Sequence, residues 1–391
     1  MATKKKIIDY NEIFYDKNNG LPDEITKAGC IALAKLGKDA WNSWSKNHPV
    51  RYEDTNQGTI AKNTVDFSDF DFSKYFEESE SKTIIHIDFK GFDFRERANF
   101  SNAIFCIRTD FSNSTFGEGT NFTGAVFKEN VYFNDTNFGL NSRFIGCKFY
   151  GKSRFIGARF DRNSSFRNSS FSKNASFIGA QFGNSADFRD TIFFSFTNFS
   201  GGQFGTDIKF DDSIFKGSAN FTASDWPLIL PYYKDIEDAK NWSCEHGATP
   251  DNFRDISFNG VEFLNHVNFS DRIFIGKTSF SYLTNDNVLD KPCVFRKAPL
   301  FFNCKLNQNI SFYGAIFPES TSGKKMMILQ FVPIEPLNLP FLNNKLYVKS
   351  KCSFVSNCLK KSFEHYQNKN YYFIYTERLV ITALASRGRY Y

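Results

Sequence analysis

The chain has 391 residues and a formal net charge of +6, and 49 of its residues are phenylalanine while only 3 are methionine. This excess of one bulky side chain predicts a core built from a repeated residue, as in a solenoid that grows by adding coils. The most apolar late stretch, residues 326–342, contains three prolines and a glutamate, so we expect no membrane-spanning segment. We also expect no signal peptide, because the lysine-rich start is followed by polar and acidic sequence.

Residues 1–60 come before the repeats that fill most of the chain. Within them, residues 21–46 carry apolar side chains at helical spacing, including Leu33, Trp41 and Trp44, and Pro22 stands at the first turn. This pattern predicts one amphipathic helix. Because the end of a β-solenoid exposes backbone groups that could pair with another chain, we expect this helix to cap the N-terminal end of the array.

A phenylalanine then recurs at alternating intervals of 5 and 6 residues, without exception, over 23 positions from Phe100 to Phe221. The residue two places before each ring is small or β-branched, as at Ala98. Such spacing fits neither an α-helix nor an ordinary strand, and it indicates coils with four short faces that each contribute one inward ring. Two units of eleven residues would close one coil of about 22, which predicts that Phe133 stacks on Phe155.

Several of these units resemble the pentapeptide-repeat family. Residues 175–179 (Ala-Ser-Phe-Ile-Gly), 186–190 (Ala-Asp-Phe-Arg-Asp) and 219–223 (Ala-Asn-Phe-Thr-Ala) are similar to its consensus of Ala, Asp or Asn, Leu or Phe, and two free residues. The family keeps a period of five, whereas every second unit here has a sixth residue, which we place at a corner. The resemblance implies a right-handed quadrilateral β-helix. Together with the spacing, it predicts an all-β solenoid with about 22 residues per coil and helical caps at both ends.

The repeats also predict how the chain is divided. The predicted parts are an N-terminal helical cap and lead-in (1–60), a pentapeptide-like β-helix (61–226), an insertion loop (227–252), a continued β-helix (253–317), and an irregular segment with a C-terminal helical cap (318–391). In related proteins a C-terminal helix mediates dimerisation, so the resemblance implies a homodimer through this last segment.

Four of the eight cysteines, Cys147, Cys293, Cys304 and Cys352, stand two residues before a repeated Phe or Leu, in the small inward slot. Cysteine serves well as a small buried side chain, and the sequence has no Cys-x-x-Cys pair. We therefore expect reduced, buried cysteines and a cytoplasmic location. Disulfides and metal binding are the alternatives.

The sequence carries no pattern typical of an enzyme. Its five histidines are scattered without the spacing of metal ligands, and it has no nucleophile-elbow, zinc-protease or kinase motif. The prediction is therefore no catalytic, cofactor-binding or metal-binding residues, no cofactor, and no enzymatic activity.

Charge is unevenly distributed along the repeats. Residues 143–173 carry eight basic side chains against one acidic, whereas residues 187–238 carry four basic against nine acidic. In a solenoid, position in the sequence becomes height along the axis, so we predict a basic collar that docks an acidic partner, either protein or nucleic acid. A solvated surface without a partner is the alternative. The basic collar consists of Arg143, Lys148, Lys152, Arg154, Arg159, Arg162, Arg167 and Lys173.

These observations favour a non-enzymatic interaction scaffold or adaptor in a bacterial cytoplasm, serving a toxin, effector or defence partner. One alternative is nucleic-acid binding through the collar and through residues 345–391, where nine basic residues interleave with aromatic ones. Aromatic packing on the last coil explains that composition equally. The resemblance implies a further alternative, since some family members imitate duplex DNA and bind topoisomerases such as gyrase. Such mimics present an acidic surface, whereas residues 88–226 hold 16 basic and 14 acidic side chains.

Overall fold

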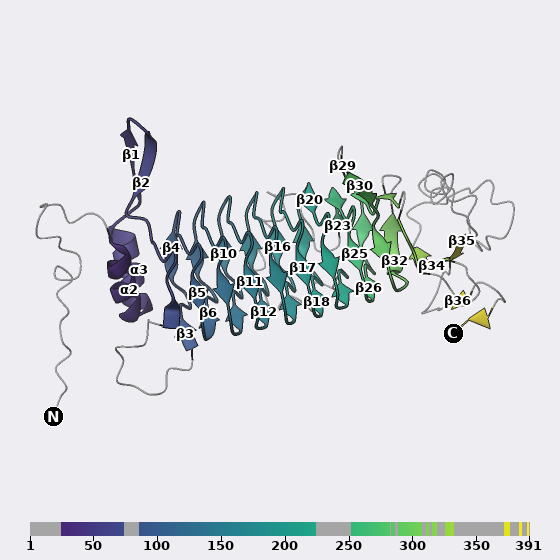
Figure 1. Ribbon diagram of the computed structural model, residues 1–391, viewed down its shortest axis with the longest axis horizontal. Helices are drawn as coiled ribbons and strands as arrows, with labels where there is room; N and C mark the ends of the chain where they lie inside the picture. Colours follow the sequence, from purple (N-terminus) through teal and green to yellow (C-terminus); the bar gives the residue numbers. More distant parts are fainter. Residues whose placement is uncertain are drawn as a thin grey trace, which may run out of the picture.

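The computed structural model describes residues 25–73, 86–223 and 252–281, most of 283–331, and three short strands between 371 and 390. Figure 1 shows a long rod of stacked coils, with the helices α2 (Lys27–Lys35) and α3 (Lys38–Asn47) at its N-terminal end. Each coil has four faces, which we number 1 to 4 in chain order, starting with the face that carries Phe100.

Each face is a stack of very short parallel strands or single bridges. Face 1 begins as bridges between Asn99, Asn121, Arg143, Ser165, Asp187 and Lys209 and continues as β20 (Ile208–Lys209), β24 (Ile256–Ser257), β28 (Thr278–Ser279) and β33 (Ile310–Ser311). Face 2 holds β5 (Ile104–Phe105), β8 (Val126–Phe127), β11 (Lys148–Phe149), β14 (Ser170–Phe171), β17 (Ile192–Phe193), β21 (Ile214–Phe215), β25 (Glu262–Phe263) and β31 (Val294–Phe295). Face 3 holds β3 (His86–Asp88), β6 (Arg108–Asp110), β9 (Val131–Tyr132), β12 (Ser153–Arg154), β15 (Ala175–Ser176), β18 (Thr197–Asn198), β22 (Ala219–Asn220), β26 (Val267–Asn268) and β32 (Leu300–Leu306). Face 4 holds β4 (Asp93–Arg95), β7 (Thr115–Phe116), β10 (Asn137–Phe138), β13 (Arg159–Phe160), β16 (Gln181–Phe182), β19 (Gln203–Phe204), β23 (Asn252–Phe253) and β27 (Ile273–Phe274).

The strands of one face pair in parallel with the strands one coil further along the chain. On face 4, for example, Asn137 lies opposite Arg159 and Phe138 lies opposite Phe160. The predicted solenoid, with about 22 residues in each coil, is therefore confirmed.

The core is made of ring stacks that run along the axis. The centroids of Phe133 and Phe155 lie 4.9 Å apart with planes inclined by 8°, so the predicted stack is confirmed. Rings on neighbouring faces meet edge to face, as do Phe144 and Phe155 at 89°. Burying each ring stabilises the fold by about 1.5–3 kcal/mol, and each aromatic pair adds about 0.5–1.5 kcal/mol.

The corners between faces differ in their backbone conformation. After faces 1 and 3, the second residue beyond the ring has a positive φ, as at Asn102 (φ 55°) and Asp135 (φ 52°). After face 4 it is the third residue, as at Asn141 (φ 60°). Asn, Asp and Gly adopt this conformation most readily. In the corner between faces 2 and 3, no described residue has a positive φ. The sixth residue of every second unit lies in the corners after faces 2 and 4.

The ring stacks continue across two breaks in the repeat. Phe210 stacks on Phe258 at 5.1 Å across the first break, and Phe263 stacks on Phe295 at 5.2 Å across the second. Within the second break lies an antiparallel hairpin of β29 (Leu283–Asn285) and β30 (Val288–Lys291). Added residues therefore lengthen a corner while the stacks of faces 1, 2 and 3 keep their register. On face 4 the rings of Phe204 and Phe253 instead meet edge to face, at 81°.

A buried arginine lies where the coils resume. Arg272 is fully buried and occupies the position two residues before Phe274, which is small or β-branched throughout the regular array. Its guanidinium donates to the carbonyl oxygens of Phe221 (2.6 Å) and Gly202 (2.9 Å), and more weakly to those of Phe199 and Thr222. Arg272 follows residues 224–251 in the chain, and all four carbonyls precede them, so its side chain links the coils on the two sides of this segment.

The N-terminal segment forms two helices, whereas the sequence predicted one. α2 begins after Thr26, whose hydroxyl accepts a hydrogen bond from the amide of Gly29 (3.0 Å). Gly37, with φ +88°, separates α2 from α3. A residue with a side chain is strained in that conformation, so glycine explains the break. Pro22 lies outside the described residues.

Helix α3 packs on the first coil. Trp41 is fully buried, lies 6.0 Å from Phe67 with nearly parallel planes, and donates its indole N–H to the carbonyl of Asp93 (2.7 Å). Asn42 bonds the carbonyl of Gly91 and the amide of Asp93. These contacts cover the end of the core. An antiparallel hairpin that the sequence did not predict, β1 (Arg51–Thr55) and β2 (Gly58–Lys62), follows α3 and projects outward at the end of the rod (Figure 1). It contacts the first coil through Tyr52, whose hydroxyl donates to the Glu96 carboxylate.

The C-terminal part is described only as strands. β34 (Lys325–Phe331) pairs in parallel with β32 and with β35 (Tyr371–Tyr375), and β36 (Ala383–Leu384) pairs with β37 (Arg389–Tyr390). The sequence predicted a helical cap within residues 318–391. Where residues 371–375 are described they are extended, and their Tyr-Tyr-Phe-Ile-Tyr sequence favours a strand. The rest of the predicted C-terminal cap lies outside the described residues.

Small inward side chains tie successive coils together. Thr136 donates its hydroxyl to the carbonyl of Phe111 (2.9 Å), and the thiol of Cys147 donates to the carbonyl of Phe122 (2.9 Å) in the same way. Cys147, Cys293 and Cys304 are fully buried, as predicted, and burial raises the pKa of the Cys147 thiol above its ordinary range. Cys352 lies outside the described residues.

Candidate docking surface

The described residues contain no group of three or more His, Cys, Asp or Glu side chains placed to hold a metal ion. No helix in the described part of the chain is long and apolar enough to cross a membrane. The charged side chains on the outside of the coils are the remaining candidates for function.

The residues of the predicted basic collar are spread around the whole coil. Arg143 lies on face 1 and Arg159 on face 4, while Arg162 and Arg167 lie in the corners on either side of face 1. The other four are on or beside the corner between faces 2 and 3, namely Lys148, Lys152, Arg154 and Lys173. The second group lies together at this corner, whereas Arg143, Arg159 and Arg162 lie around the opposite corner, between faces 4 and 1.

The corner between faces 2 and 3 gathers further basic residues from neighbouring coils. We call this corner, with the outward strand residues that border it from residue 104 to residue 220, the basic edge. It carries seven basic side chains and only two acidic ones, Asp110 and Glu129. In the part of the chain that the structure describes, no carboxylate forms an ion pair with the four collar residues on this edge. The basic side chains are Arg108, Lys128, Lys148, Lys152, Arg154, Lys173 and Lys216.

Aromatic side chains lie between these charges. The ring of Tyr132 has the guanidinium carbons of Arg108 and Arg154 at 4.8 and 5.3 Å from its centroid. Lys216 places its ammonium 4.3 Å from the centroid of Phe194. These are cation–π contacts, which hold the charges near the rings.

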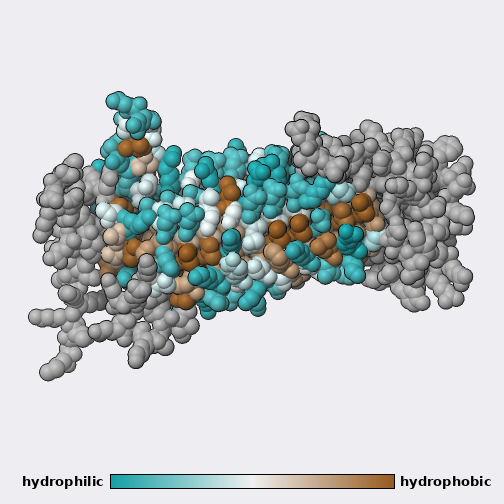
Figure 2. All heavy atoms as spheres, in the orientation of Figure 1, coloured by the Kyte–Doolittle hydropathy of each residue, from teal (hydrophilic) through white to brown (hydrophobic). Residues whose placement is uncertain are grey.

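Three aromatic side chains of the edge are exposed, and Phe194 is one of them. Tyr150, Phe194 and Phe196 have exposed fractions of 49%, 45% and 40%. Figure 2 shows an interrupted row of apolar residues along the long axis, over the strands of face 2. Its members stand at the outward positions of the face 2 strands, for example Ile192 and Ile214, which are paired in register. The edge therefore combines positive charge with apolar surface.

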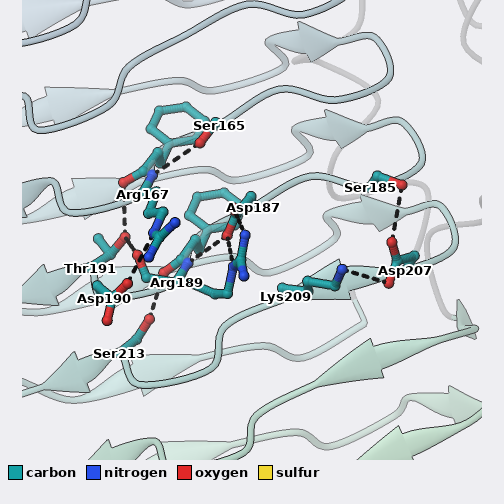
Figure 3. A network of polar contacts seen from close by, with 12 residues as sticks. Ser165, Arg167, Ser185, Asp187, Arg189, Asp190, Thr191, Asp207, Lys209 and Ser213 are labelled. Carbon is teal, nitrogen blue, oxygen red and sulfur yellow. Dashed lines mark hydrogen bonds and ion pairs between the residues drawn. The ribbon is translucent and has the colours of Figure 1, made fainter. Parts of the chain in front are cut away.

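The charges near face 1 are neutralised by each other instead. Figure 3 shows Arg167 bonded to Asp190 (3.1 Å), Arg189 bonded to Asp187 (2.7 Å) and Lys209 paired with Asp207 (3.2 Å). Burial alone would raise the pKa of Asp187, but its bonds from the Arg189 guanidinium and amide outweigh burial and hold the pKa below its ordinary value. Arg167 of the collar is thus already paired within the protein.

A neighbouring carboxyl behaves in the opposite way. Asp211 is largely buried beside face 1, where it accepts hydrogen bonds from the Ser257 hydroxyl and from the amide of Asn259 (2.8 Å). Removal from water raises the pKa of Asp211 above its ordinary value despite these two bonds. A carboxyl with a raised folded pKa stabilises the fold at low pH, and this contribution is lost as the pH rises through the folded pKa.

We expect Asp211→Asn to change the pH dependence of stability. The asparagine oxygen can accept the same two hydrogen bonds without a buried charge. The free energy of unfolding of the variant, relative to the wild type, should therefore be more favourable at pH 7 than at pH 4. Urea unfolding at both pH values measures this, and an identical difference at pH 4 and pH 7 would show that the carboxyl is not desolvated.

The basic edge could have been found from the sequence by aligning the successive coils and reading down each column. Counting charge along the chain found the collar, because Lys148, Lys152 and Arg154 lie close together within a single coil. It missed Arg108 and Lys128 below and Lys216 above, which join the edge only through stacking of the coils.

Comparison with known proteins agrees with the geometry. Residues 133–181 and 144–192 match the family described as pentapeptide repeats (9 copies). No curated protein and no solved structure matches the chain. The matched residues lie in the middle of the ring stacks, and the same kind of coil continues on both sides of them. Residues 133–192 are therefore pentapeptide repeats, and the resemblance predicted from the sequence is confirmed there.

Proposed function

We propose that this protein is a non-enzymatic interaction scaffold that docks an acidic partner on the basic edge. The observation that carries the proposal is that seven basic side chains, with aromatic rings between them, lie on one edge of a rigid rod. Charges of one sign gathered on one surface attract a partner of the opposite sign and orient it. Repeat solenoids commonly use such long surfaces for binding.

The finer parts of the proposal are its setting and assembly. We place the protein in a bacterial cytoplasm as an adaptor for a toxin, effector or defence partner, which buried reduced cysteines support. We keep a homodimer through residues 318–391 as part of the proposal. DNA mimicry has the least support, because basic and acidic side chains are nearly balanced over residues 88–226.

Charge reversal on the edge tests the proposal. The triple variant Lys148→Glu, Lys152→Glu, Arg154→Glu should bind poly-L-glutamate at least about tenfold more weakly than the wild type at low salt. Its binding should also depend less on salt, because fewer charges are screened. Fluorescence anisotropy with labelled poly-L-glutamate at several salt concentrations measures both effects.

The matched control reverses three collar residues at the same height but off the edge, Arg143, Arg159 and Arg162. This variant has the same net charge and should keep most of the affinity. An equal loss of affinity for poly-L-glutamate in both variants would show that binding depends only on the net charge of the protein and not on the basic edge. A wild type that does not bind poly-L-glutamate at low salt would reject the docking function.

Nucleic-acid binding is the second candidate, favoured by the aromatic rings between the basic residues. A single-stranded oligothymidine should then bind at about 50 mM salt, where phosphate contacts are strong, and the edge variant should abolish this binding. An oligonucleotide that stays free at this salt concentration removes the candidate.

A further inference from the structure

We infer that the partner is an acidic protein segment with an apolar side chain, and that this side chain docks on a defined site of the basic edge. The inference rests on the proposed function and adds the chemical class of the partner. We call the site the Phe194 site, and it consists of Ile192, Phe194, Phe196 and Ile214, with Lys173 and Lys216 beside it.

The Phe194 site departs from the pattern of its corner. In the neighbouring coils, the position of Phe194 is Ser172 or Lys216, and the position of Phe196 is Asn174 or Ser218. The rings are not needed for the core, because Phe193 already fills the inward position of this coil and is fully buried. Exposed apolar clusters on a soluble surface are typical of binding sites.

The site is continuous across two coils. Ile192 and Ile214 lie side by side in register on face 2, and Phe194 follows Ile192 after a single inward residue. Ser195, between the two exposed rings, donates its hydroxyl to the side chain of Asn174 in the coil below (2.7 Å). This bond ties the corner to its neighbour, so the rings project from an anchored backbone.

Positive charge lies on both sides of the rings. Lys173 is exposed in the preceding coil and Lys216 is exposed in the following coil, with its ammonium above the Phe194 ring at 4.3 Å. An apolar side chain seated on the rings would therefore place carboxylates on either side of it next to these lysines. Apolar anchors surrounded by complementary charge give an interface both affinity and orientation.

The same contacts disfavour nucleic acid as the partner. A base stacks on an open aromatic face. The ring of Tyr132 is contacted by two guanidinium groups, those of Arg108 (4.8 Å) and Arg154 (5.3 Å), and the ammonium of Lys216 occupies one face of Phe194. The aliphatic Ile192 and Ile214 offer no stacking surface, whereas they suit a branched aliphatic side chain.

Two synthetic peptides test the inference, one of four Glu-Glu-Leu repeats and one of four Glu-Glu-Ser repeats. They have the same charge and differ only in their apolar side chains. The wild type should bind the leucine peptide at least about tenfold more tightly than the serine peptide. The double variant Phe194→Ser, Phe196→Ser should bind both peptides equally, and Tyr150→Ser, which removes an exposed ring elsewhere on the edge, should keep the preference.

The outcomes separate this inference from the proposed function. Equal binding of both peptides by the wild type, weakened by the edge reversal, would overturn the apolar site and leave the acidic-partner scaffold standing. Binding of neither peptide at low salt would reject both. Tighter binding of oligothymidine than of either peptide, lost in the Phe194 and Phe196 variant, would overturn the inference in favour of nucleic acid. Thermal unfolding of each variant checks that it remains folded.

Discussion

Replacing Phe166 by alanine is expected to lower the free energy of unfolding by about 3–5 kcal/mol. Its ring is fully buried and stacks on Phe144 at 4.8 Å and on Phe188 at 4.9 Å, with planes within 6° and 1°. It also meets Phe160 edge to face at 5.2 Å. The alanine variant would leave a cavity in the middle of the stack that rigid neighbouring coils cannot fill. Urea unfolding followed by circular dichroism measures the loss.

Phe194→Ala is the matched control, because it removes the same ring from an exposed position. That substitution should change the free energy of unfolding by no more than about 0.5 kcal/mol. A loss below about 1 kcal/mol for Phe166→Ala would contradict the account of the core, since it would mean that the stack does not depend on its central rings.

Arg272→Leu is expected to destabilise the protein by about 3–5 kcal/mol. The guanidinium donates to backbone carbonyls of Phe221, Gly202, Phe199 and Thr222. Without it, the carbonyls of Phe221 and Gly202 lose this donor, whereas those of Phe199 and Thr222 keep the amides of Gly202 and Gly201. Each buried acceptor left without a donor costs about 1–3 kcal/mol. Leucine is apolar and fills part of the same space, so the loss would come from the hydrogen bonds more than from packing. Thermal and urea unfolding measure it.

An exposed arginine supplies the comparison for this second experiment. Arg162→Leu removes the same charge from the surface and should leave stability within about 0.5 kcal/mol of the wild type. If Arg272→Leu were equally mild, the hydrogen bonds to the carbonyls of Phe221 and Gly202 would contribute nothing to stability, and the arginine would not join the two parts of the solenoid.

The coil could be predicted from the sequence because the regular spacing of one residue type, phenylalanine, indicates it. Every fifth or sixth position holds a ring that can only be buried by stacking, so the spacing of Phe133 and Phe155 already contained the register. The break between the N-terminal helices was harder to predict, because apolar spacing continues through Gly37 and only the backbone conformation of that residue ends α2. The strand at residues 371–375 was missed because a resemblance to helical tails outweighed a local aromatic run.

The basic edge could be predicted only in part, for a geometric reason. Counting charge along the chain does not show on which of the four faces of a coil each residue lies. Arg143 and Arg154 belong to the same collar but lie on different faces. The residues that complete the basic edge come from coils above and below. Arg272 gave no sequence signal, since one arginine in a small-residue position stands out only when the position is known to be inward.

The backbone of the corners explains why the basic edge lies where it does. After faces 1, 3 and 4, one residue of each corner has a positive φ, and such positions mostly admit Gly, Asn or Asp. The corner after face 2 has no such residue among those described, so φ does not restrict its side chains, although a Cβ at Gly151 or Gly217 would lie 2.2 Å from backbone of the preceding coil. Selection can therefore exchange Lys, Tyr and Phe along this one edge without altering the coil.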